Sequence, residues 1–461
     1  RHVRLSRRQI VLGAAGTAGG AATAACGAAG EGGAKPSANK APVSLRWSTW
    51  GNATSPMVQA AEKGLALFKE KLPYVTVTAE PQVNTPNGPL WSEKHIAEWV
   101  AGTGPDVTGN NSASLVDWGR QSYPLKLDDL IKRDAKAVPL SDYATPYLNL
   151  LRSTERGQFA LPMYMGITGM YYSKSLFQRK GVPLPDNTWD WNKLEDAMRR
   201  LTSAPDAQDK SYGYMLFPNI AMHGIFIRQA GGNEVDPKDN RKAVFHSPEG
   251  LKALQWIHDR MWKDRSLPKN TDIEGPTTAG GFGLSFLGAV RAGKLGMATQ
   301  GSQDLTKALL EQPEAVNDWD VALLPKGPAQ RDTGHTLDAW LIASVSKNKD
   351  ESWELMKYLQ SDPWIEIAAS VVGHQPARKS WQDKYVGLIK KQYPALASKN
   401  LTVFTEPITA GFARPNEYFL KHTEANAIWN TASNATFVNN TASVPDAFRK
   451  AAEEINKLHG V

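Results

Sequence analysis

The sequence contains a single cysteine among its 461 residues and no hydrophobic run long enough to cross a membrane stably. One thiol excludes an intramolecular disulfide framework and any metal site built from several cysteines. The nine histidines are scattered without H-x-H or H-E-x-x-H spacing, and no G-x-S-x-G or Walker A motif occurs. Metallohydrolase, serine hydrolase and nucleotide-phosphate chemistry therefore lack sequence support. We expect no cofactor and no metal.

Acidic residues are missing from the first 25 positions, which hold four arginines. The pair Arg7 and Arg8 precedes a short stretch rich in alanine and glycine, an order typical of an export signal and similar to a twin-arginine signal. The whole chain has a formal net charge of +7, so removal of residues 1–25 leaves +3. No block of like charges occurs elsewhere, and nucleic-acid binding loses its main support.

The lone cysteine, Cys26, follows a run of small residues. This context resembles a bacterial lipobox, in which the cysteine carries a lipid and becomes the first residue of the mature protein. Thr23 stands where leucine is usual, and residues 22–24 (Ala-Thr-Ala) offer an alternative cleavage site of the A-x-A kind. We predict an export signal over 1–25, lipidation of Cys26 and a flexible tether over 26–42.

Beyond the tether, strand and helix patterns alternate. Residues 43–50 and 75–79 alternate apolar and polar positions, and residues 104–107 begin a third strand, with helical patterns between them. This β-α-β-α-β order predicts a parallel α/β sheet with right-handed crossovers. Ser247 and Ser443 are expected to cap two later helices, because each precedes a proline-containing helical pattern. The length allows two or three domains.

A set of short motifs spans essentially all of residues 43–461. In chain order they are Trp47–Gly51, Ala101–Val107, Leu161–Pro162, Tyr171–Phe177, Gly181–Pro185, Thr188–Asp190, Gln229–Gly232, Phe245–Gly250, Gly293–Ala298, Leu324–Pro325, Trp340–Ser344, Ser346–Asp350, Gly373–Arg378 and Trp429–Asn430. No single motif is specific. The ordered set resembles the extracellular solute-binding proteins of bacterial ATP-driven (ABC) importers, in the sugar-binding family 1 with the maltose-binding-protein-like fold.

The resemblance implies an α/β, two-lobe periplasmic-binding-protein fold of type II, with a ligand cleft between discontinuous lobes joined by a hinge. Lobe 1 is expected from residues 43–165 and 335–378, and lobe 2 from residues 166–334 and 379–461. It also implies a monomeric receptor, not an enzyme, that binds a sugar or oligosaccharide by hinge closure and delivers it to the permease subunits of an ABC transporter. With a lipid on Cys26, the protein would be held at the outer face of the cell membrane.

A sugar presents hydroxyl groups and flat C–H faces, so its site needs aromatic platforms and a few polar side chains. The 15 tryptophans outnumber the 13 phenylalanines. Trp50 ends the first strand, where open sheets place ligands, although rim packing is its alternative role. Trp340 matches a family position at which an aromatic residue lines the cleft, after a turn that departs from the family's Gly-Gly. Asp338 in that turn is a candidate acceptor for two sugar hydroxyls, or an ordinary turn acid.

The other candidate contacts lie at strand ends or in loops where the family contacts solute, with ordinary loop packing as the alternative. They are Gly51, Asn52, Asn110, Asn111, Tyr164, Phe217, His223, Gln300 and Arg414. A polyol or a sugar acid is not excluded, and Arg414 or His223 would matter for the latter. Paired tyrosines bind ferric ion in some related proteins, but Tyr171 and Tyr172 lie in an alternating strand and are assigned to packing.

A secreted carbohydrate enzyme is the alternative function, because tryptophan-rich clefts also serve glycosidases. Such an enzyme needs two carboxylates about 5 Å or about 6.5–9.5 Å apart around the scissile bond. Asp106, Asp338 and Glu417 are the carboxylates that the sequence offers, but it does not place them. The ordered motifs favour a binding protein.

Overall fold

The computed structural model describes residues 40–461 except 51–55, 83–90, 122, 154–156, 205–206, 208, 218, 274–283 and 312–315. Residues 1–39 lie outside the described residues, and with them the expected export signal, Cys26 and most of the tether. The chain from Pro42 to Val461 forms one compact unit. Within the described residues, no helix combines the length and the apolar character that crossing a bilayer requires.

Strand β1 (Val43–Trp50) pairs in parallel with β2 (Val75–Gln82) from Val43 opposite Val75 to Trp50 opposite Gln82. Helix α1 (Pro56–Lys71) joins them and begins at a proline, whose missing N–H costs nothing in the first turn. A third strand, β3 (Val107–Asn111), pairs in parallel with β1. The β-α-β-α-β order expected from the sequence is confirmed.

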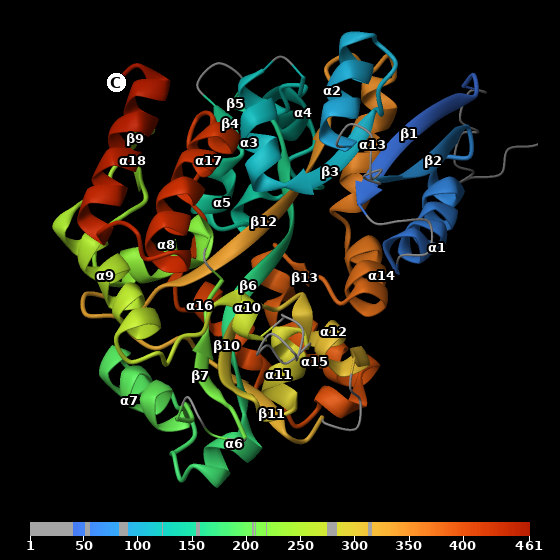
Figure 1. Cartoon of the computed structure of the whole chain (residues 1–461). Helices are drawn as coiled ribbons and strands as arrows, with labels where there is room; N and C mark the ends of the chain where they lie inside the picture. Colours follow the sequence, from blue (N-terminus) through green and yellow to red (C-terminus); the bar gives the residue numbers. More distant parts are fainter. Residues whose placement is uncertain are drawn as a thin grey trace, which may run out of the picture. The chain divides into compact units, whose positions relative to one another are not determined.

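The central sheet has the strand order β2-β1-β3-β12-β6-β10-β7 (Figure 1). Strands β12 and β6 run antiparallel to their neighbours, so the sheet is mixed. The strands not yet given are β4 (Arg152–Ser153), β5 (Gly157–Gln158), β6 (Leu161–Ser173), β7 (Tyr212–Met215), β8 (Val235–Asp236), β9 (Asp239–Ala243), β10 (Leu295–Gly301), β11 (Trp319–Ala322), β12 (Thr333–Ile342), β13 (Gln375–Pro376) and β14 (Ala413–Pro415).

Two strands run through both halves of this sheet. The first part of β6 pairs with β12 as far as Ile167, and from Thr168 onward β6 pairs with β10 and then also with β11. All 13 residues of β6 are buried. Strand β12 begins beside β14 and ends beside β3. Strands β6 and β12 are therefore the crossing strands between two half-sheets.

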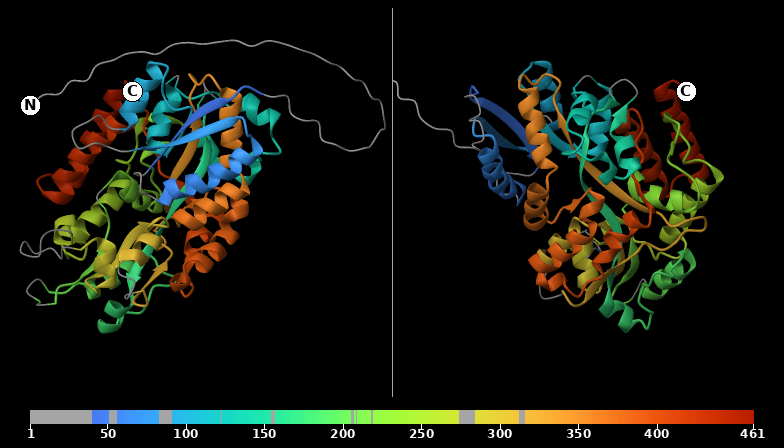
Figure 2. Two further views of the ribbon diagram at one scale, coloured as in Figure 1. Left: turned by 90° about the vertical axis from the view of Figure 1, so that its right-hand side faces the viewer. Right: turned by 180° about the vertical axis from the view of Figure 1, so that it is seen from behind.

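Helices cover both half-sheets, and α1 and α14 lie side by side against the β1 half (Figure 2). The remaining helices are α2 (Trp91–Val100), α3 (Ser112–Arg120), α4 (Asp128–Arg133), α5 (Thr145–Leu150), α6 (Lys174–Arg179), α7 (Trp191–Leu201), α8 (Ile220–Gln229), α9 (Pro248–Trp262), α10 (Asn270–Ile273), α11 (Phe286–Arg291), α12 (Asp304–Glu311), α13 (Lys349–Leu359), α14 (Asp362–Val372), α15 (Gln382–Gln392), α16 (Glu406–Thr409), α17 (His422–Ser433) and α18 (Val444–His459).

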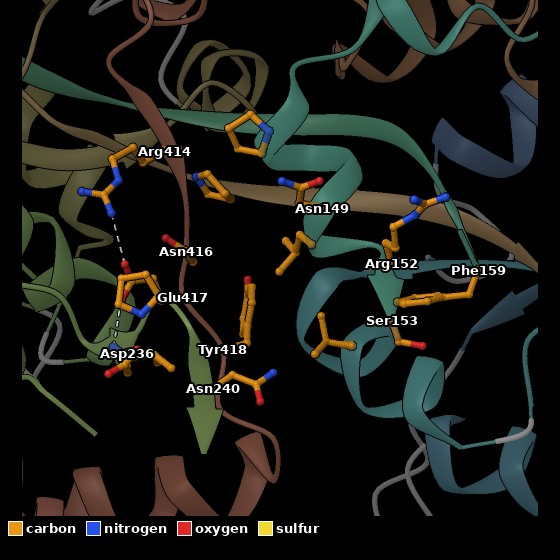
Figure 3. A pocket seen from close by; sticks show the side chains of 16 residues that line it. Asn149, Arg152, Ser153, Phe159, Asp236, Asn240, Arg414, Asn416, Glu417 and Tyr418 are labelled. Carbon is orange, nitrogen blue, oxygen red and sulfur yellow. Dashed lines mark hydrogen bonds and ion pairs between the residues drawn. The ribbon is translucent and has the colours of Figure 1, made fainter. Parts of the chain in front are cut away.

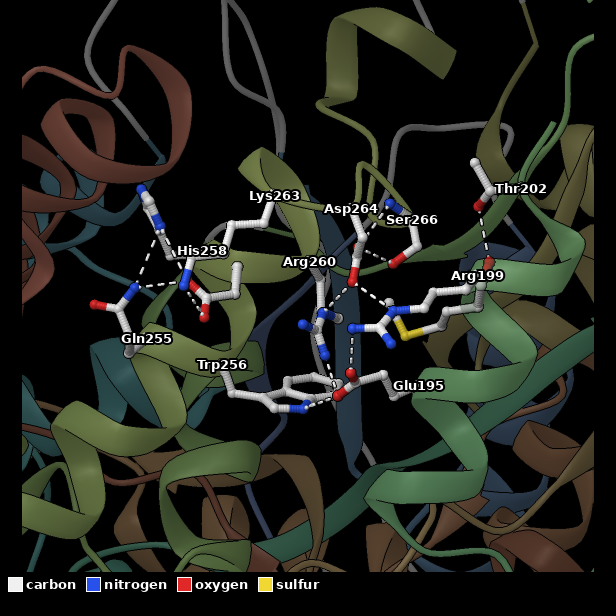
Figure 4. Close-up of polar contacts among 12 residues, drawn as sticks. Glu195, Arg199, Thr202, Gln255, Trp256, His258, Arg260, Lys263, Asp264 and Ser266 are labelled. Atoms are coloured by element: carbon white, nitrogen blue, oxygen red, sulfur yellow. Dashed lines mark hydrogen bonds and ion pairs between the residues drawn. The ribbon is translucent and has the colours of Figure 1, made fainter. Parts of the chain in front are cut away.

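The two serines expected to cap helices do so in the structure. Ser247 caps α9 by accepting a hydrogen bond from the Gly250 N–H at 3.2 Å, and Ser443 caps α18 in the same way. A charged cluster then holds α7 against α9 (Figure 4). In it, buried Arg260 forms ion pairs with both Glu195 and Asp264. These contacts fix the helix layer that packs on the β7 half of the sheet.

Candidate functional site

The candidate site lies where the crossing strands leave the first half-sheet. Asp338 on β12 stands opposite Asn111, the last residue of β3, and opposite Tyr164 on β6. Directly opposed residues of an antiparallel pair share a face of the sheet, so the side chains of Asp338 and Tyr164 are neighbours. Asn110, Asn111, Tyr164 and Asp338, four predicted contacts, are thus brought together along the backbone. We call this region the crossing site.

The carboxyl group of Asp338 is half-buried, and burial raises its pKa to about 7. Tyr164 behind it is buried, and its hydroxyl accepts a hydrogen bond from Trp364 Nε1 at 3.1 Å. Among the described residues, no lysine or arginine pairs with Asp338 and no donor bonds its carboxylate. The carboxylate is therefore available to an incoming hydrogen-bond donor.

Next to Asp338, the crossing site also contains neutral polar side chains on and beside β12. Thr336 is exposed and stands opposite Gly166 of β6. A Cβ on Gly166 would clash with Gln303 Oε1 and come within 2.8 Å of Thr336 Oγ1, so the glycine leaves room for both side chains. Gln303 is exposed and also covers Gly301. A carboxylate, a hydroxyl and an amide side by side suit a ligand rich in hydroxyl groups.

Replacement of Gly166 by alanine is expected to weaken ligand binding about tenfold while changing stability little. The new methyl group must displace the flexible end of Gln303, which costs little in folding but moves the amide away from its place beside Thr336. Calorimetric titration and thermal unfolding of the variant measure the two effects. Unchanged affinity would show that Gln303 does not contact the ligand.

A cavity of about 470 Å³ opens beside the start of β12 (Figure 3). In Figure 3 the ring of Tyr418 stands between Glu417 on one side and Ser153 on the other. Arg414, on β14, lines the cavity and stands opposite Gly334, four residues before Asp338 on β12. At about 3.4 Å per residue, the two positions are about 14 Å apart along the strand. We call this space the Arg414 cavity.

A buried ion cluster holds the wall of the Arg414 cavity in place. Arg228 has no exposed surface, forms an ion pair with Glu234 and bonds Asp332 Oδ1 at 3.2 Å. Glu417 accepts hydrogen bonds from the backbone N–H groups of Glu234 and Val235, each at 2.8 Å. Burial raises the pKa of Glu234, although the positive charge of Arg228 acts to lower it.

Arg414 belongs to the same cluster. Its guanidinium group donates to Asn233 Oδ1 at 3.0 Å and to Glu417 Oε1 at 3.3 Å, and it lies 3.7 Å from Asp332. Its charge is already balanced by carboxylates of the protein. A role for Arg414 in holding an acidic sugar is therefore less favoured than a role in positioning the cavity wall.

Comparison with known families decides what kind of protein this geometry belongs to. Residues 50–366 match the family described as bacterial extracellular solute-binding proteins. The chain belongs to this family. Putative binding proteins of Brucella abortus and Brucella suis are 22% identical to it over 347 residues, which span 74% of this chain and 78% of theirs.

Solved structures show the fold of this solute-binding protein. It matches an ABC substrate-binding protein of Listeria monocytogenes in complex with cycloalternan, at a TM-score of 0.72 and 16% identity over 91% of this chain and 99% of that one. It also matches the GacH receptor of Streptomyces glaucescens, solved with acarbose, at a TM-score of 0.69 and 18% identity. That match covers 91% of this chain and 99% of the receptor. The match to the sugar-binding protein MalE of Xanthomonas citri has a TM-score of 0.72 and 16% identity. It covers 90% of this chain and 97% of that protein. The fold is the expected two-lobe periplasmic-binding-protein type.

Trp340 does not line the cleft of the solute-binding protein, contrary to the expectation. It is fully buried, meets Trp47 edge-on at 5.4 Å between ring centroids, and fills the space above Gly109. Trp47 in turn contacts Trp364 of α14 at 5.3 Å. Pairing with β3 directs the Trp340 ring into this tryptophan core, so no ring face is left for a sugar.

His223 is also a core residue rather than a loop contact. It lies on α8, is 1% exposed, and contacts the Phe437 ring at 4.6 Å. Burial lowers its pKa to about 3, so it stays neutral and offers no charge to a sugar acid. The structure therefore places His223 in the packing of α8 and not in a loop, as the sequence had suggested.

The remaining predicted contacts are placed as follows. Asn110 and Gln300 are buried on β3 and β10, and Phe217 is half-buried just after β7. Gly51 and Asn52 lie outside the described residues, as do the side chains of Trp50 and Asn111. Sequence reasoning missed Thr336 and Gln303. The sequence features that could have indicated them are Gly166 and Gly301, which leave room for a neighbouring side chain. Only the fold shows that the neighbours are Thr336 and Gln303.

The carboxylates considered for glycosidase chemistry are not assembled into a pair. Asp106 precedes β3, at the opposite end of that strand from Asn111, and accepts hydrogen bonds from the Arg46 backbone N–H and Ser346 Oγ. Glu417 is bonded within the ion cluster. Asp338 remains as the one open group of the three. In the described part of the chain, no cluster of three histidine, cysteine or acidic side chains could hold a metal.

Asp338→Asn is expected to stabilise the unliganded protein by about 1–3 kcal/mol at pH 8 and much less at pH 5. The folded pKa, about 7, lies above the unfolded value of about 3.9, so the charged carboxylate costs stability as the pH rises between these values. Tyr164 and His374 face the same side but stay neutral there, since burial raises the pKa of the tyrosine and lowers that of the histidine to about 4. Urea unfolding at both pH values measures the difference; equal effects would refute the desolvation argument.

Proposed function

We propose that this solute-binding protein captures a sugar or oligosaccharide by hinge closure and delivers it to the permease subunits of an ABC importer. The observation that carries the proposal is the crossing site, where Asp338 and Thr336 lie on β12 and the side chain of Gln303 lies beside Thr336 over Gly166. Structural relatives described with cycloalternan, acarbose and maltose support a carbohydrate ligand. Capture requires no covalent chemistry, so the protein would release its ligand unchanged.

The arrangement of the crossing strands supports closure around the ligand. The proposed lobe boundary at residues 165 and 166 falls inside β6, close to the point where its partner changes from β12 to β10. The boundary at 334 and 335 falls inside β12, where its partner changes from β14 to β6. Bending at these two places would move the half-sheets together over the ligand.

A thermal-shift screen of neutral and substituted mono- and oligosaccharides on the full chain tests the proposal. A ligand at 100 times its dissociation constant is expected to stabilise the folded state by about 2.7 kcal/mol. Chromatography of the same mixtures after incubation should recover the saccharide intact. Cleavage of the saccharide at enzyme-like rates would show that the protein is a glycosidase and not a receptor. The absence of any shift in melting temperature across the panel would reject carbohydrate capture.

We further propose that Cys26 carries the lipid that holds the protein at the outer face of the membrane. The supporting features are the arginine pair and the small residues before Cys26. In a bacterial host that processes such signals, mass spectrometry of the purified protein should find a lipid on an N-terminal cysteine. Cys26→Ser should release the protein from the membrane fraction. A mature protein that begins at residue 25 and carries no lipid would support the alternative cleavage site.

A further inference from the structure

Asp338 differs from the other buried carboxylates because the described residues supply it with no cation. Asp332 and Glu234 each form an ion pair with Arg228, and Glu417 forms one with Arg414. Asp338 is half-enclosed by β3 and β6, and desolvation alone raises its pKa. A carboxylate held in this way is unfavourable while the site is empty, and it gains most from a ligand group that brings a positive charge.

The two arginines of the ion cluster cannot move to Asp338 without breaking other pairs. Arg414 is tied to Asn233 and Glu417, and Arg228 is fully buried between Glu234 and Asp332. The cluster contains three carboxylates and two guanidinium groups, so it supplies no excess positive charge to the site. The charge at Asp338 is left for the ligand to balance.

We propose that Asp338 makes the crossing site selective for a saccharide that carries a positively charged amine. This inference rests on the proposed carbohydrate-binding function and narrows its ligand class. The ammonium group would donate charge-assisted hydrogen bonds to the Asp338 carboxylate in a partly desolvated place, where the attraction is stronger than in water. Thr336 and Gln303 would take hydroxyl groups of the same or the next sugar ring.

A hydroxyl group would also bond Asp338, but with a weaker gain. It satisfies the carboxylate as a hydrogen-bond acceptor and leaves its charge unbalanced. N-acetylation of the amine removes the positive charge and adds bulk, so an acetylated sugar should resemble the neutral sugar in affinity or bind more weakly. The three forms of one sugar, with hydroxyl, amine and acetamide at the same carbon, therefore separate charge from hydrogen bonding.

The test titrates the full chain by calorimetry with matched probes at pH 7.5, where the Asp338 carboxyl, with its pKa of about 7, is mostly ionised. These are glucose, glucosamine and N-acetylglucosamine, the galactose and mannose equivalents, and cellobiose with its diamine and diacetamide counterparts. In the sugar series that binds, the amine is expected to bind at least tenfold more tightly than the other two forms. Asp338→Asn and Asp338→Ser should abolish that preference, so that the amine and the neutral sugar bind each variant with affinities within about twofold of each other. Glu366→Gln removes one exposed acidic charge from α14, outside the set of residues assigned to the site, and should retain the preference.

Each result bears on a different statement. Equal or weaker binding of the amine to the wild type overturns the selectivity but leaves carbohydrate capture standing. An amine preference that persists in both Asp338 variants overturns the role of Asp338. Failure of every saccharide, in this panel and in the neutral screen, overturns the inference and the proposed function together. A preference lost only in the Asp338 variants supports the inference.

Discussion

Arg228→Met is expected to lower the free energy of unfolding by about 3–5 kcal/mol. The guanidinium group of Arg228 is fully buried and compensates Glu234 and Asp332, both themselves buried. Methionine has a similar length but no charge, so it would leave two carboxylates in the interior with only Arg414 at 3.7 Å from one of them. Equilibrium unfolding in urea, followed by circular dichroism, measures the loss.

The matched control is Arg241→Met. Arg241 pairs with Asp239 at 2.8 Å, but its side chain is 48% exposed, so water replaces the lost interaction. We expect little change in the urea midpoint for this variant. A loss for Arg228→Met no larger than that of the control would show that the buried cluster contributes nothing to stability. A second readout is affinity for the saccharide, which should fall because Glu417 and Arg414 lose their fixed positions.

Trp340→Ala is expected to destabilise the protein by about 3–5 kcal/mol. The substitution removes the whole indole from a buried space beside Trp47 and Gly109. Trp340→Phe keeps an aromatic ring there and should cost clearly less than the alanine variant. Urea unfolding of both variants gives the two values under the same conditions.

The outcome distinguishes a core residue from a ligand platform. A core Trp340 predicts a large loss of stability in the alanine variant, with saccharide affinity of the folded fraction reduced little. A platform would give the reverse, with stability nearly unchanged and affinity reduced by about 1–3 kcal/mol. The second pattern would contradict the placement of Trp340 in the tryptophan core.

Local patterns in the sequence predict the first three strands and the two serine-capped helices well. Alternation over residues 43–50 and the serine before each proline-containing helix depend on neighbours in the chain, so they can be read without the fold. The family also follows from the order of short motifs. Asp338 was chosen from the sequence, and the structure places its carboxyl group beside the crossing of β6 and β12.

The direction of a side chain on β12 could not be predicted in the same way. This strand has partners on both edges, and its pairing with β6 shifts register between Asp338 and Ala339. Such a shift changes which residues oppose one another, so Trp340 and Asp338 cannot be assigned to cleft or core from alternation alone. Tertiary pairing decides that Trp340 joins Trp47 in the interior.

Long-range clusters were likewise invisible in the sequence. The cluster of Arg228, Glu234, Asp332 and Glu417 comes from three separated segments, which meet only when the end of α8, the start of β12 and the segment after β14 pack together. Gln303 is placed by two glycines, one of them on a different strand. Their positions depend on the whole fold, and a single sequence carries no local sign of them.

Hydrogen–deuterium exchange tests the central claim, that this protein binds a saccharide at the crossing of β6 and β12. The full chain is compared with and without the saccharide that gives the largest shift in the thermal screen. We predict slower exchange in peptides that cover residues 161–169, 299–304 and 333–339, with peptides from the outer helices α7 and α15 unchanged. Protection confined to other segments, or none at saturating saccharide, would contradict it.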